Sequence, residues 1–412
     1  MTEAFNSEVT RKSYLEAVDG GPCAVEGISC AGAHIGLKPN GAPDCALFVS
    51  EQPCKTAAFF TTNKLLGAHI PVFRETLKAS RNRCRALLVN SKNANCATGE
   101  KGERDNLAVA AALASKLGVP PEMSLFCSTG VIGRPLPVDL ISGGLDSLVA
   151  SLSKDGALSA ARAILTTDTR EKMFAVSVKQ GGKKYHIGGV AKGSGMIAPN
   201  MATMFAFIFT DIDIPFSMLR SVAADCVDDT FNSVSVDGDM SPNDTVLVMA
   251  NGMSGVKLDA KDTGGRERFR EALCLVAGAL AREIARDGEG ATKLVSIEIA
   301  GAASEADARR MARGIAESLL VKTAIFGGDP NWGRIVSAAA TSGAALDPAK
   351  ARLDIDGLRV YDKGRIADAP DSIFKGKEVT IRLDAGAGRS SARFWSCDLS
   401  YDYVKINAEY TT

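Results

Sequence analysis

Apolar runs of strand type alternate along this 412-residue chain with segments that have the apolar spacing of helices. The strand-like runs are 85–90, 172–178, 204–214, 244–250, 293–300, 378–384 and 392–398. The helical segments are 105–117, 157–165, 217–229, 265–286 and 304–320, and the last two carry Arg and Glu on one face, as exposed helices do. This order mixes hairpin-like strands with helix-linked strands. It predicts a layered α/β (α+β) fold with mixed or antiparallel sheets.

The length allows two domains, or one large core with additions. The sequence contains no internal repeat and no low-complexity linker. Small residues and a proline at 341–350 (TSGAALDPAK) separate a helical region from a β-rich tail. We therefore expect a main layered core over residues 1–345 and a smaller C-terminal part over residues 346–412.

Charge and composition are those of an ordinary soluble globular protein. The chain has 48 basic and 48 acidic residues, so its net charge gives no reason to expect nucleic acid or an anionic membrane as a partner. Its amino-terminal residues are polar and mixed in charge, without the apolar core of a signal peptide. No apolar run reaches the length of a membrane span. These features predict a cytoplasmic protein.

Cysteine and histidine usage gives little support for a metal or redox site. The ten cysteines are scattered, and no two have the two-residue gap of a zinc or redox pair, so free buried thiols are the better expectation. The histidines are His34, His69 and His186 alone. A His-rich metal site is thereby excluded, and a Ser-His-Asp triad has few candidates for its base. If the chain is an enzyme, we expect its base to be another group.

Glycines cluster in four segments, CSTGVIG (127–133), GGVAKGSGMIAPNMAT (188–203), DGEGATK (287–293) and FGGDPNWGR (326–334). Taken singly, each segment is most simply a turn, because glycine adopts positive φ without steric penalty. The AKGSG run does not fit a phosphate-binding P-loop, since its lysine precedes the glycines and a strand-like run follows. No segment fits the dinucleotide-binding fingerprint either. Nucleotide binding is therefore a poor explanation of these glycines.

Thr203 stands directly before the strand-like run 204–214. A threonine hydroxyl needs an adjacent base before it can attack a carbonyl. If the bond between Ala202 and Thr203 is cut, Thr203 gains an α-amino group, which titrates at about 7.7–8.0 and can take the hydroxyl proton. Nucleophile and base would then belong to one residue. The simpler alternative, which the residue pattern alone favours, is that Thr203 is only a β-branched strand residue.

The run KGSGMIAPNMATM (192–204) resembles the self-cleavage segment of the ornithine acetyltransferase family, which is processed before the threonine of its Met-Ala-Thr. Other segments resemble the same family, in the family's order, from about residue 89 to the last residue. They are VNSKNANCATG (89–99), CSTGVIG (127–133), TTDT (166–169), DGDMSPNDTV (237–246), DGEGATK (287–293), FGGDPNWGRI (326–335) and the final Asn-Ala-Glu-Tyr-Thr-Thr (407–412). The first sixty or so residues contain no comparably sharp match.

The resemblance implies an acyltransferase of cyclic arginine biosynthesis that needs no cofactor and no metal. N2-acetylornithine would donate its acetyl group to Thr203, and glutamate would then take the group to give N-acetylglutamate. The Thr129 hydroxyl and the Gly130 backbone N–H would stabilise the tetrahedral oxyanion in both steps. Acetyl-CoA remains open as a second donor, because some members of the family also use it.

The substrate-contacting positions implied by the resemblance are Thr166, Lys192, Thr203, Glu289, Asn407 and Thr412. By matching charges, we assign Lys192 to the α-carboxylate of ornithine and Glu289 to its side-chain amine. The alternative is that both are solvated loop charges. Met240 and Pro242 stand where members of the family usually carry threonines.

The fold implied by the resemblance is a self-processing, N-terminal-nucleophile-like fold, in which a two-layered β core is flanked by helices and followed by a smaller C-terminal α/β part. Cleavage would leave an α-chain (1–202) and a β-chain (203–412) that share sheets, and two of each chain would form a heterotetramer. The nearest rival is a self-processing amide hydrolase or aminopeptidase of related fold, in which water replaces glutamate. A non-catalytic amino-acid-binding protein that stays uncut is a more distant rival.

Overall fold

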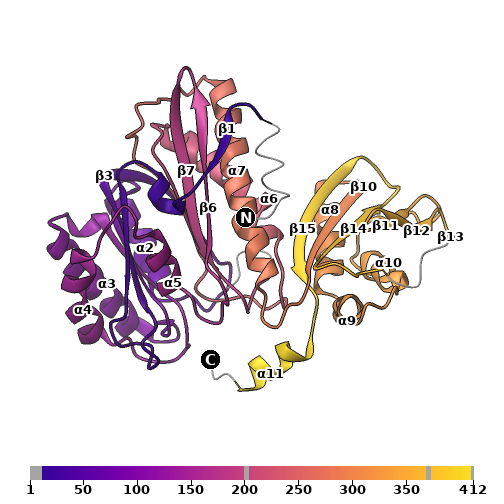
Figure 1. The fold of residues 1–412 in the computed structure, drawn as a ribbon, viewed down its shortest axis with the longest axis horizontal. Helices are drawn as coiled ribbons and strands as arrows, with labels where there is room; N and C mark the ends of the chain where they lie inside the picture. The colour runs from indigo at the N-terminus through magenta and orange to yellow at the C-terminus, as the bar shows by residue number, and fades with distance from the viewer. Residues whose placement is uncertain (1–11, 199–203, 368–372, 410–412) are drawn as a thin grey trace.

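The computed structural model describes residues 12–198, 204–367 and 373–409. Within these ranges it contains a larger sheet of nine strands and a smaller sheet of six (Figure 1). The larger sheet consists of β1 (Leu15–Val18), β2 (Ile28–Ala33), β3 (Cys45–Phe60), β4 (Arg83–Asn90), β5 (Ser124–Ser128), β6 (Lys172–Gln180), β7 (Lys183–Lys192), β8 (Phe205–Thr210) and β9 (Thr245–Ala250).

The larger sheet is mixed, as predicted. Its strands follow the order β1-β6-β7-β8-β9-β3-β4-β5, and β2 pairs with β3. β8 pairs with β9 and β4 with β5 in parallel, whereas the other neighbours are antiparallel. β8 and β9 therefore lie in the middle of the sheet, between β7 and the long strand β3.

Helices and short 3-10 turns cover this sheet. They are η1 (Gly21–Ala24), α2 (His69–Ala79), α3 (Gly99–Leu117), η2 (Pro121–Met123), α4 (Val138–Ala150), α5 (Ala157–Ala163), α6 (Phe216–Asp229), η3 (Phe231–Ser233) and α7 (Thr263–Arg286). The longest, α7, packs along β6 and β7 (Figure 1). It begins at Asp262, whose carboxylate accepts the N–H of Gly265 at 2.8 Å. α3 ends at Gly118, which adopts a φ of 62°.

Side chains of β8 alternate between the two faces of the sheet. Phe205, Phe207 and Phe209 belong to one hydrophobic cluster with Phe48 of β3, and Ala206 belongs to another cluster with α6 and α7. The ring centroid of Phe48 is 5.7 Å from that of Phe207 and 5.9 Å from that of Phe209. A further cluster joins the opposite face of β3, β4 and β5 to α3 and α4. The larger sheet thus folds over on itself, so that β8 and β9 face β3, β4 and β5 across one cluster and helices pack on the outer faces. The predicted layered α/β fold is confirmed.

The smaller sheet consists of β10 (Leu294–Ala302), β11 (Arg352–Ile355), β12 (Leu358–Asp362), β13 (Arg365–Ile366), β14 (Glu378–Asp384) and β15 (Ser390–Cys397), in the order β13-β12-β11-β14-β10-β15. Its own hydrophobic cluster includes residues of β10 and of α8 (Glu305–Glu317), α9 (Leu319–Gly327) and α10 (Trp332–Ala340). The C-terminal part therefore begins near Leu294, and the predicted boundary after residue 345 falls inside it. The small residues at 341–350 connect α10 to β11, which explains why they looked like a boundary.

Two predicted elements have different ends in the structure. The predicted helix 304–320 is interrupted at Ser318, whose ψ is 111° and whose hydroxyl accepts the N–H of Val321 at 3.3 Å to begin α9. The predicted strand 204–214 ends at Thr210, because the Asp211 carboxylate turns back to accept the N–H of His186 at 2.7 Å. In the described part of the chain, no helix is long and apolar enough to span a membrane.

The last helix, α11 (Tyr401–Glu409), follows β15 and extends away from the smaller sheet toward the end of the larger one (Figure 1). None of its described side chains is buried. The hydroxyl of Ser400, just before it, donates to the carbonyl oxygen of Gly290 at 2.6 Å. The C-terminal segment is thereby tied to the loop that follows α7.

Candidate active site

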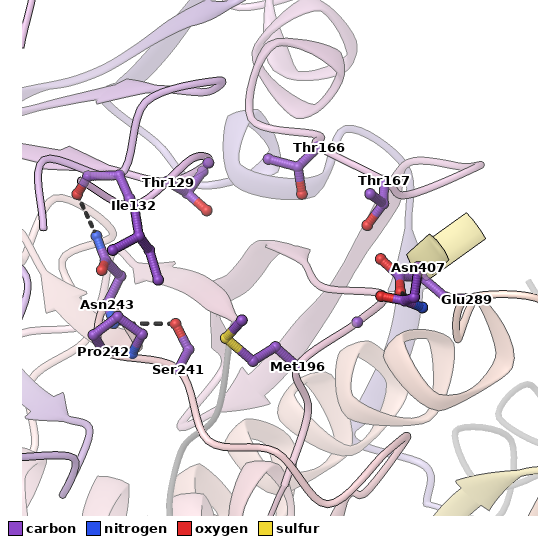
Figure 2. Close-up of a pocket in the computed structure, with 13 residues that line it drawn as sticks. Thr129, Ile132, Thr166, Thr167, Met196, Ser241, Pro242, Asn243, Glu289 and Asn407 are labelled. Carbon is purple, nitrogen blue, oxygen red and sulfur yellow. Dashed lines mark hydrogen bonds between the residues drawn. The ribbon is translucent and has the colours of Figure 1, made fainter. Parts of the chain in front are cut away.

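One pocket is lined by residues from widely separated segments of the chain, and most of their side chains surround an open space (Figure 2). The lining residues are Ala94, Thr129, Gly130, Ile132, Thr166, Thr167, Gly195, Met196, Ser241, Pro242, Asn243, Glu289 and Asn407. The structure therefore brings together five of the predicted site residues, Thr129, Gly130, Thr166, Glu289 and Asn407. In Figure 2 the hydroxyls of Thr129, Thr166 and Thr167 point toward the middle of this space.

Three predicted residues, Ala202, Thr203 and Thr412, lie outside the described residues, so the cleavage site, the nucleophile and the C-terminal contact stay predictions. Met204, the residue after Thr203, is buried, and its N–H donates to Asp244 Oδ1 at 2.7 Å. The next residue along, Phe205, pairs with Thr245 at the start of β9.

Gly130 follows the end of β5 and takes a φ of 135°, which L side chains rarely adopt. A Cβ at this position would lie 2.3 Å from the carbonyl carbon of Lys92 and 2.6 Å from the amide nitrogen of Asn93. Glycine is required here because the segment before α3 passes directly behind it. The same lack of a side chain leaves the backbone beside Thr129 open to the pocket.

Lys192, the last residue of β7, is buried behind two lining residues of the pocket, Thr129 and Thr166, with its side chain 1% exposed. Its Nζ is 2.8 Å from Thr166 Oγ1 and 3.5 Å from Thr129 Oγ1. An ammonium group only donates, so both hydroxyl oxygens accept, and the hydrogen of Thr129 is left to point into the pocket. Burial lowers the pKa of Lys192, although Asp168 partly opposes this. The alternative that Lys192 is a solvated loop charge is wrong.

Glu289 and Asn407 meet on the opposite side of the pocket from Thr129 (Figure 2). Asn407 Nδ2 donates to Glu289 Oε2 at 2.9 Å, and the N–H of Glu289 donates to the carbonyl oxygen of Ser194 at 2.9 Å. A Cβ on Gly195 would lie 2.3 Å from Glu289 Cδ, so the carboxylate lies directly over this glycine. The pocket thus has two hydroxyls backed by a buried ammonium on one side and a carboxylate on the other, which is complementary to an amino acid with a second amine.

Two aspartates of the segment 237–246 hold the backbone on either side of the undescribed residues 199–203. Asp237 accepts the N–H of Met196 at 2.6 Å and that of Ile197 at 2.8 Å, and burial raises its pKa to about 6. Burial also raises the pKa of Asp244 well above its ordinary value, against the effect of the Met204 N–H. Asp244 Oδ2 has no hydrogen-bond partner among the described residues.

Sequence reasoning missed eight lining residues: Ala94, Ile132, Thr167, Gly195, Met196, Ser241, Pro242 and Asn243. All of them fall within the segments on which the family resemblance rests, so segment membership was the signal that could have found them. Asn243 shows how the segments converge, because its Nδ2 donates to the carbonyl oxygens of Ala94 and Ser128 at 2.6 and 2.7 Å. FGGDPNWGRI (326–335) is the one quoted segment that contributes no residue to the described lining.

The histidines take structural positions rather than positions at the pocket. His34 and His186 lie beside the carboxylates of Asp44 and Asp211, and buried His69 has its Nε2 3.0 Å from Thr245 Oγ1. Burial lowers the pKa of His69 to about 3. The ten cysteines are free. Over the described ranges, no group of three or more His, Cys, Asp or Glu side chains could hold a metal ion.

Comparison with known proteins identifies the family of this chain. The family model described as the ArgJ family matches residues 29–412. The arginine biosynthesis bifunctional protein ArgJ of Symbiobacterium thermophilum is 43% identical over 404 residues, which is 97% of this chain and 100% of the relative. The protein of the same name from Geobacter sulfurreducens is 44% identical over 393 residues, which is 94% of this chain and 100% of the relative.

A solved structure of an ornithine acetyltransferase from Mycobacterium tuberculosis, complexed with ornithine, is 33% identical to this chain, with a TM-score of 0.41. The match covers 45% of this chain and 98% of the solved chain. Because the family model and the sequence relatives extend over nearly the whole length, this protein belongs to the ArgJ family.

Proposed function

We propose that this protein transfers the acetyl group of N2-acetylornithine to glutamate, through an acetyl ester on Thr203, as a step of arginine biosynthesis. The observation that carries the proposal is the pocket in which Thr129 and Thr166, whose hydroxyls are held by the buried Lys192, face Glu289. Such a pocket matches ornithine, whose α-carboxylate and side-chain ammonium lie at opposite ends. The name shared by the relatives, arginine biosynthesis bifunctional protein, supports the same pathway.

In the first half-reaction, Thr203 Oγ attacks the acetyl carbonyl and its proton passes to the Thr203 α-amine. The Thr129 hydroxyl and the Gly130 N–H stabilise the oxyanion of the tetrahedral intermediate. The C–N bond then breaks, and the leaving nitrogen of ornithine takes the proton from the α-ammonium group. In the second half-reaction, the α-amine of glutamate attacks the ester and Thr203 recovers its proton as N-acetylglutamate leaves.

The proposal includes maturation of the chain by its own cleavage between Ala202 and Thr203. The resulting α- and β-chains remain together and form a heterotetramer with a second pair. Neither half-reaction changes an oxidation state or requires more than an ester and two amines, so no cofactor and no metal is included. A cytoplasmic location fits the ten free cysteines, which a reducing compartment would preserve.

The deciding assay follows ornithine release from N2-acetylornithine, with and without glutamate. We expect release that depends on glutamate, with ping-pong kinetics. Equal release without glutamate would instead support an amide hydrolase, and a parallel reaction with acetyl-CoA establishes whether it also serves as donor. In the same assay Thr203→Ala should be inactive and should run as one full-length band on a denaturing gel. Thr203→Ser should retain part of both cleavage and transfer, because it keeps the hydroxyl.

A further inference from the structure

A buried ion-pair network lies behind the pocket, around Lys172. This lysine is the first residue of β6, and its side chain is 0% exposed. Its Nζ lies 2.8 Å from Asp168 Oδ1 and 2.6 Å from Asp287 Oδ2. These two aspartates are also buried, with side chains 0% and 1% exposed. Lys172 does not line the described part of the pocket.

Asp168 holds the side of the pocket that carries the hydroxyls and the ammonium. Its Oδ2 accepts the N–H of Thr166 at 3.0 Å, and its Oδ1 accepts the N–H of Gly193 at 2.6 Å. Its Oδ2 is also 3.9 Å from Lys192 Nζ. The position of Thr166 and of the chain just after Lys192 therefore depends on this carboxylate.

Asp287 holds the side of the pocket that carries Glu289, two positions further along the chain. Its carboxylate accepts the N–H of Thr169 at 3.0 Å and also the Thr169 hydroxyl. Its carbonyl oxygen accepts the Ser194 hydroxyl at 2.6 Å, and the carbonyl oxygen of Ser194 accepts the N–H of Glu289 at 2.9 Å. Asp287 thus joins the loops on which the two sides of the pocket stand.

We infer that Lys172 is a positioning residue of the acyl-transfer site, which fixes the distance between the loop that carries Thr166 and the loop that carries Glu289. This inference rests on the proposed function. Two buried carboxylates repel each other, and the ammonium between them removes that repulsion. Although burial opposes it, the two aspartates raise the pKa of Lys172, so the bridge stays charged.

Loss of the bridge has a specific consequence for Lys192. With Lys172 in place, Asp168 is paired, and Lys192 Nζ stays 2.8 Å from the Thr166 hydroxyl but 3.9 Å from the carboxylate. Without Lys172, the nearest cation to Asp168 is Lys192, and the attraction draws it away from the hydroxyls of Thr129 and Thr166. Both the binding of the substrate carboxylate and the orientation of the Thr129 hydroxyl then suffer.

The test compares Lys172→Met with a control, Lys55→Met, in the purified, cleaved enzyme. Lys55 also bridges two groups, because its Nζ lies 2.7 Å from Asp213 Oδ1 and 2.9 Å from the carbonyl oxygen of Ile214. It lies far from the pocket: it pairs with Ala250 at one end of β9, whereas the lining residue Asn243 precedes the other end. We expect Lys172→Met to raise KM for N2-acetylornithine and to lower kcat/KM about 100-fold, as small misplacements of binding groups do. Lys55→Met should keep the wild-type KM and kcat and lose less Tm, because the Lys55 side chain is 29% exposed.

If Lys172→Met does not fold, the double variant Lys172→Met/Asp287→Asn replaces it in the test. The double variant restores the original net charge of zero to the cluster of Lys172, Lys192, Asp168 and Asp287. Wild-type KM and kcat in the folded variant would overturn the role of Lys172, and so would an equal loss of activity in Lys55→Met. A wild-type enzyme that transfers no acetyl group would overturn the proposed function instead. The two failures are therefore distinguishable.

Discussion

Asp244 is buried at the start of β9, where parallel pairing of Phe205 with Thr245 brings it level with Met204. Its Oδ1 accepts the Met204 N–H at 2.7 Å, one residue beyond the predicted nucleophile. Burial raises the pKa of this carboxyl well above its ordinary value, against the effect of the Met204 N–H. A carboxyl at this position holds the backbone one residue after the predicted cleavage site, because its oxygen gives the buried Met204 N–H an acceptor.

We therefore expect two substitutions of Asp244 to differ in their effect on maturation. Asp244→Asn keeps an acceptor for the Met204 N–H in a side chain of nearly the same shape, and it should cleave at close to the wild-type rate. Asp244→Ala leaves that N–H buried without a partner, and a loss of about 1–3 kcal/mol should slow cleavage by roughly 5- to 150-fold. A time course on denaturing gels measures both, with Ser177→Ala on β6 as a control for removing a buried polar group. Wild-type cleavage by the alanine variant would show that this contact does not matter.

At the scale of single residues, the sequence predicted those that belong to segments resembling a known family, and it missed those whose role depends on partners distant in the chain. Thr129, Thr166 and Glu289 could be found because each belongs to a segment with a recognisable pattern. Lys172 could not, because the partner that gives it a role, Asp287, lies 115 positions away in the chain. The burial of Lys192 was unpredictable for the same reason, since only the packed sheet removes its side chain from water.

Among the elements, the described part of the β7–β8 connection, residues 193–198, is held by Asp237. The backbone of this part is also paired, because the carbonyl oxygen of Ile197 accepts the N–H of Val236 at 2.9 Å. Asp237 has a pKa of about 6, raised by burial from an ordinary value of 3.8. A group with a raised pKa in the folded state favours folding most when protonated, and this contribution is lost as the pH rises through about 6.

The resulting prediction concerns unfolding between pH 7.5 and pH 5. As the pH falls through this interval, the Asp237 carboxyl takes up a proton in the folded protein, whereas in the unfolded chain the same carboxyl stays mostly ionised. This difference should add on the order of 1 kcal/mol to the free energy of unfolding. Asp237→Asn cannot titrate and should lack this increment. Urea midpoints of wild type and variant, at equal protein concentration, give the difference between their pH dependences. Equal pH dependence in the two proteins would rule out Asp237 as the titrating group.

Element prediction found β8 and β9 but missed their neighbour β7. β8 and β9 were found from their continuous apolar runs, as expected for strands in the middle of a sheet. β7 was missed because it begins with two lysines and contains Gly188 and Gly189. The structure explains the first of these glycines: a Cβ on Gly188 would lie 2.0 Å from the carbonyl oxygen of Gly21 in η1. Such a close approach of distant backbone leaves no periodic pattern in the sequence.

For the whole molecule, the most consequential feature is the position of β8 and β9 between β7 and β3. If the chain is cut before Thr203, these two strands belong to the β-chain, whereas all other strands of the larger sheet belong to the α-chain. β8 and β9 are buried along their full lengths. The two chains would therefore share one hydrophobic core, and separating them would expose both faces of the sheet.

We accordingly expect the two chains of the mature protein to separate only when the fold itself is lost. In native buffer they should elute together in gel filtration, although a denaturing gel shows two bands. Since unfolding of the cleaved protein releases two molecules, its urea midpoint should rise with protein concentration. The uncut Thr203→Ala protein serves as the comparison. Because all strands of its larger sheet belong to a single chain within one protomer, its urea midpoint should depend less on protein concentration. Elution of separate chains in native buffer would contradict the shared core, because strands in the middle of a sheet cannot leave it while the sheet remains intact.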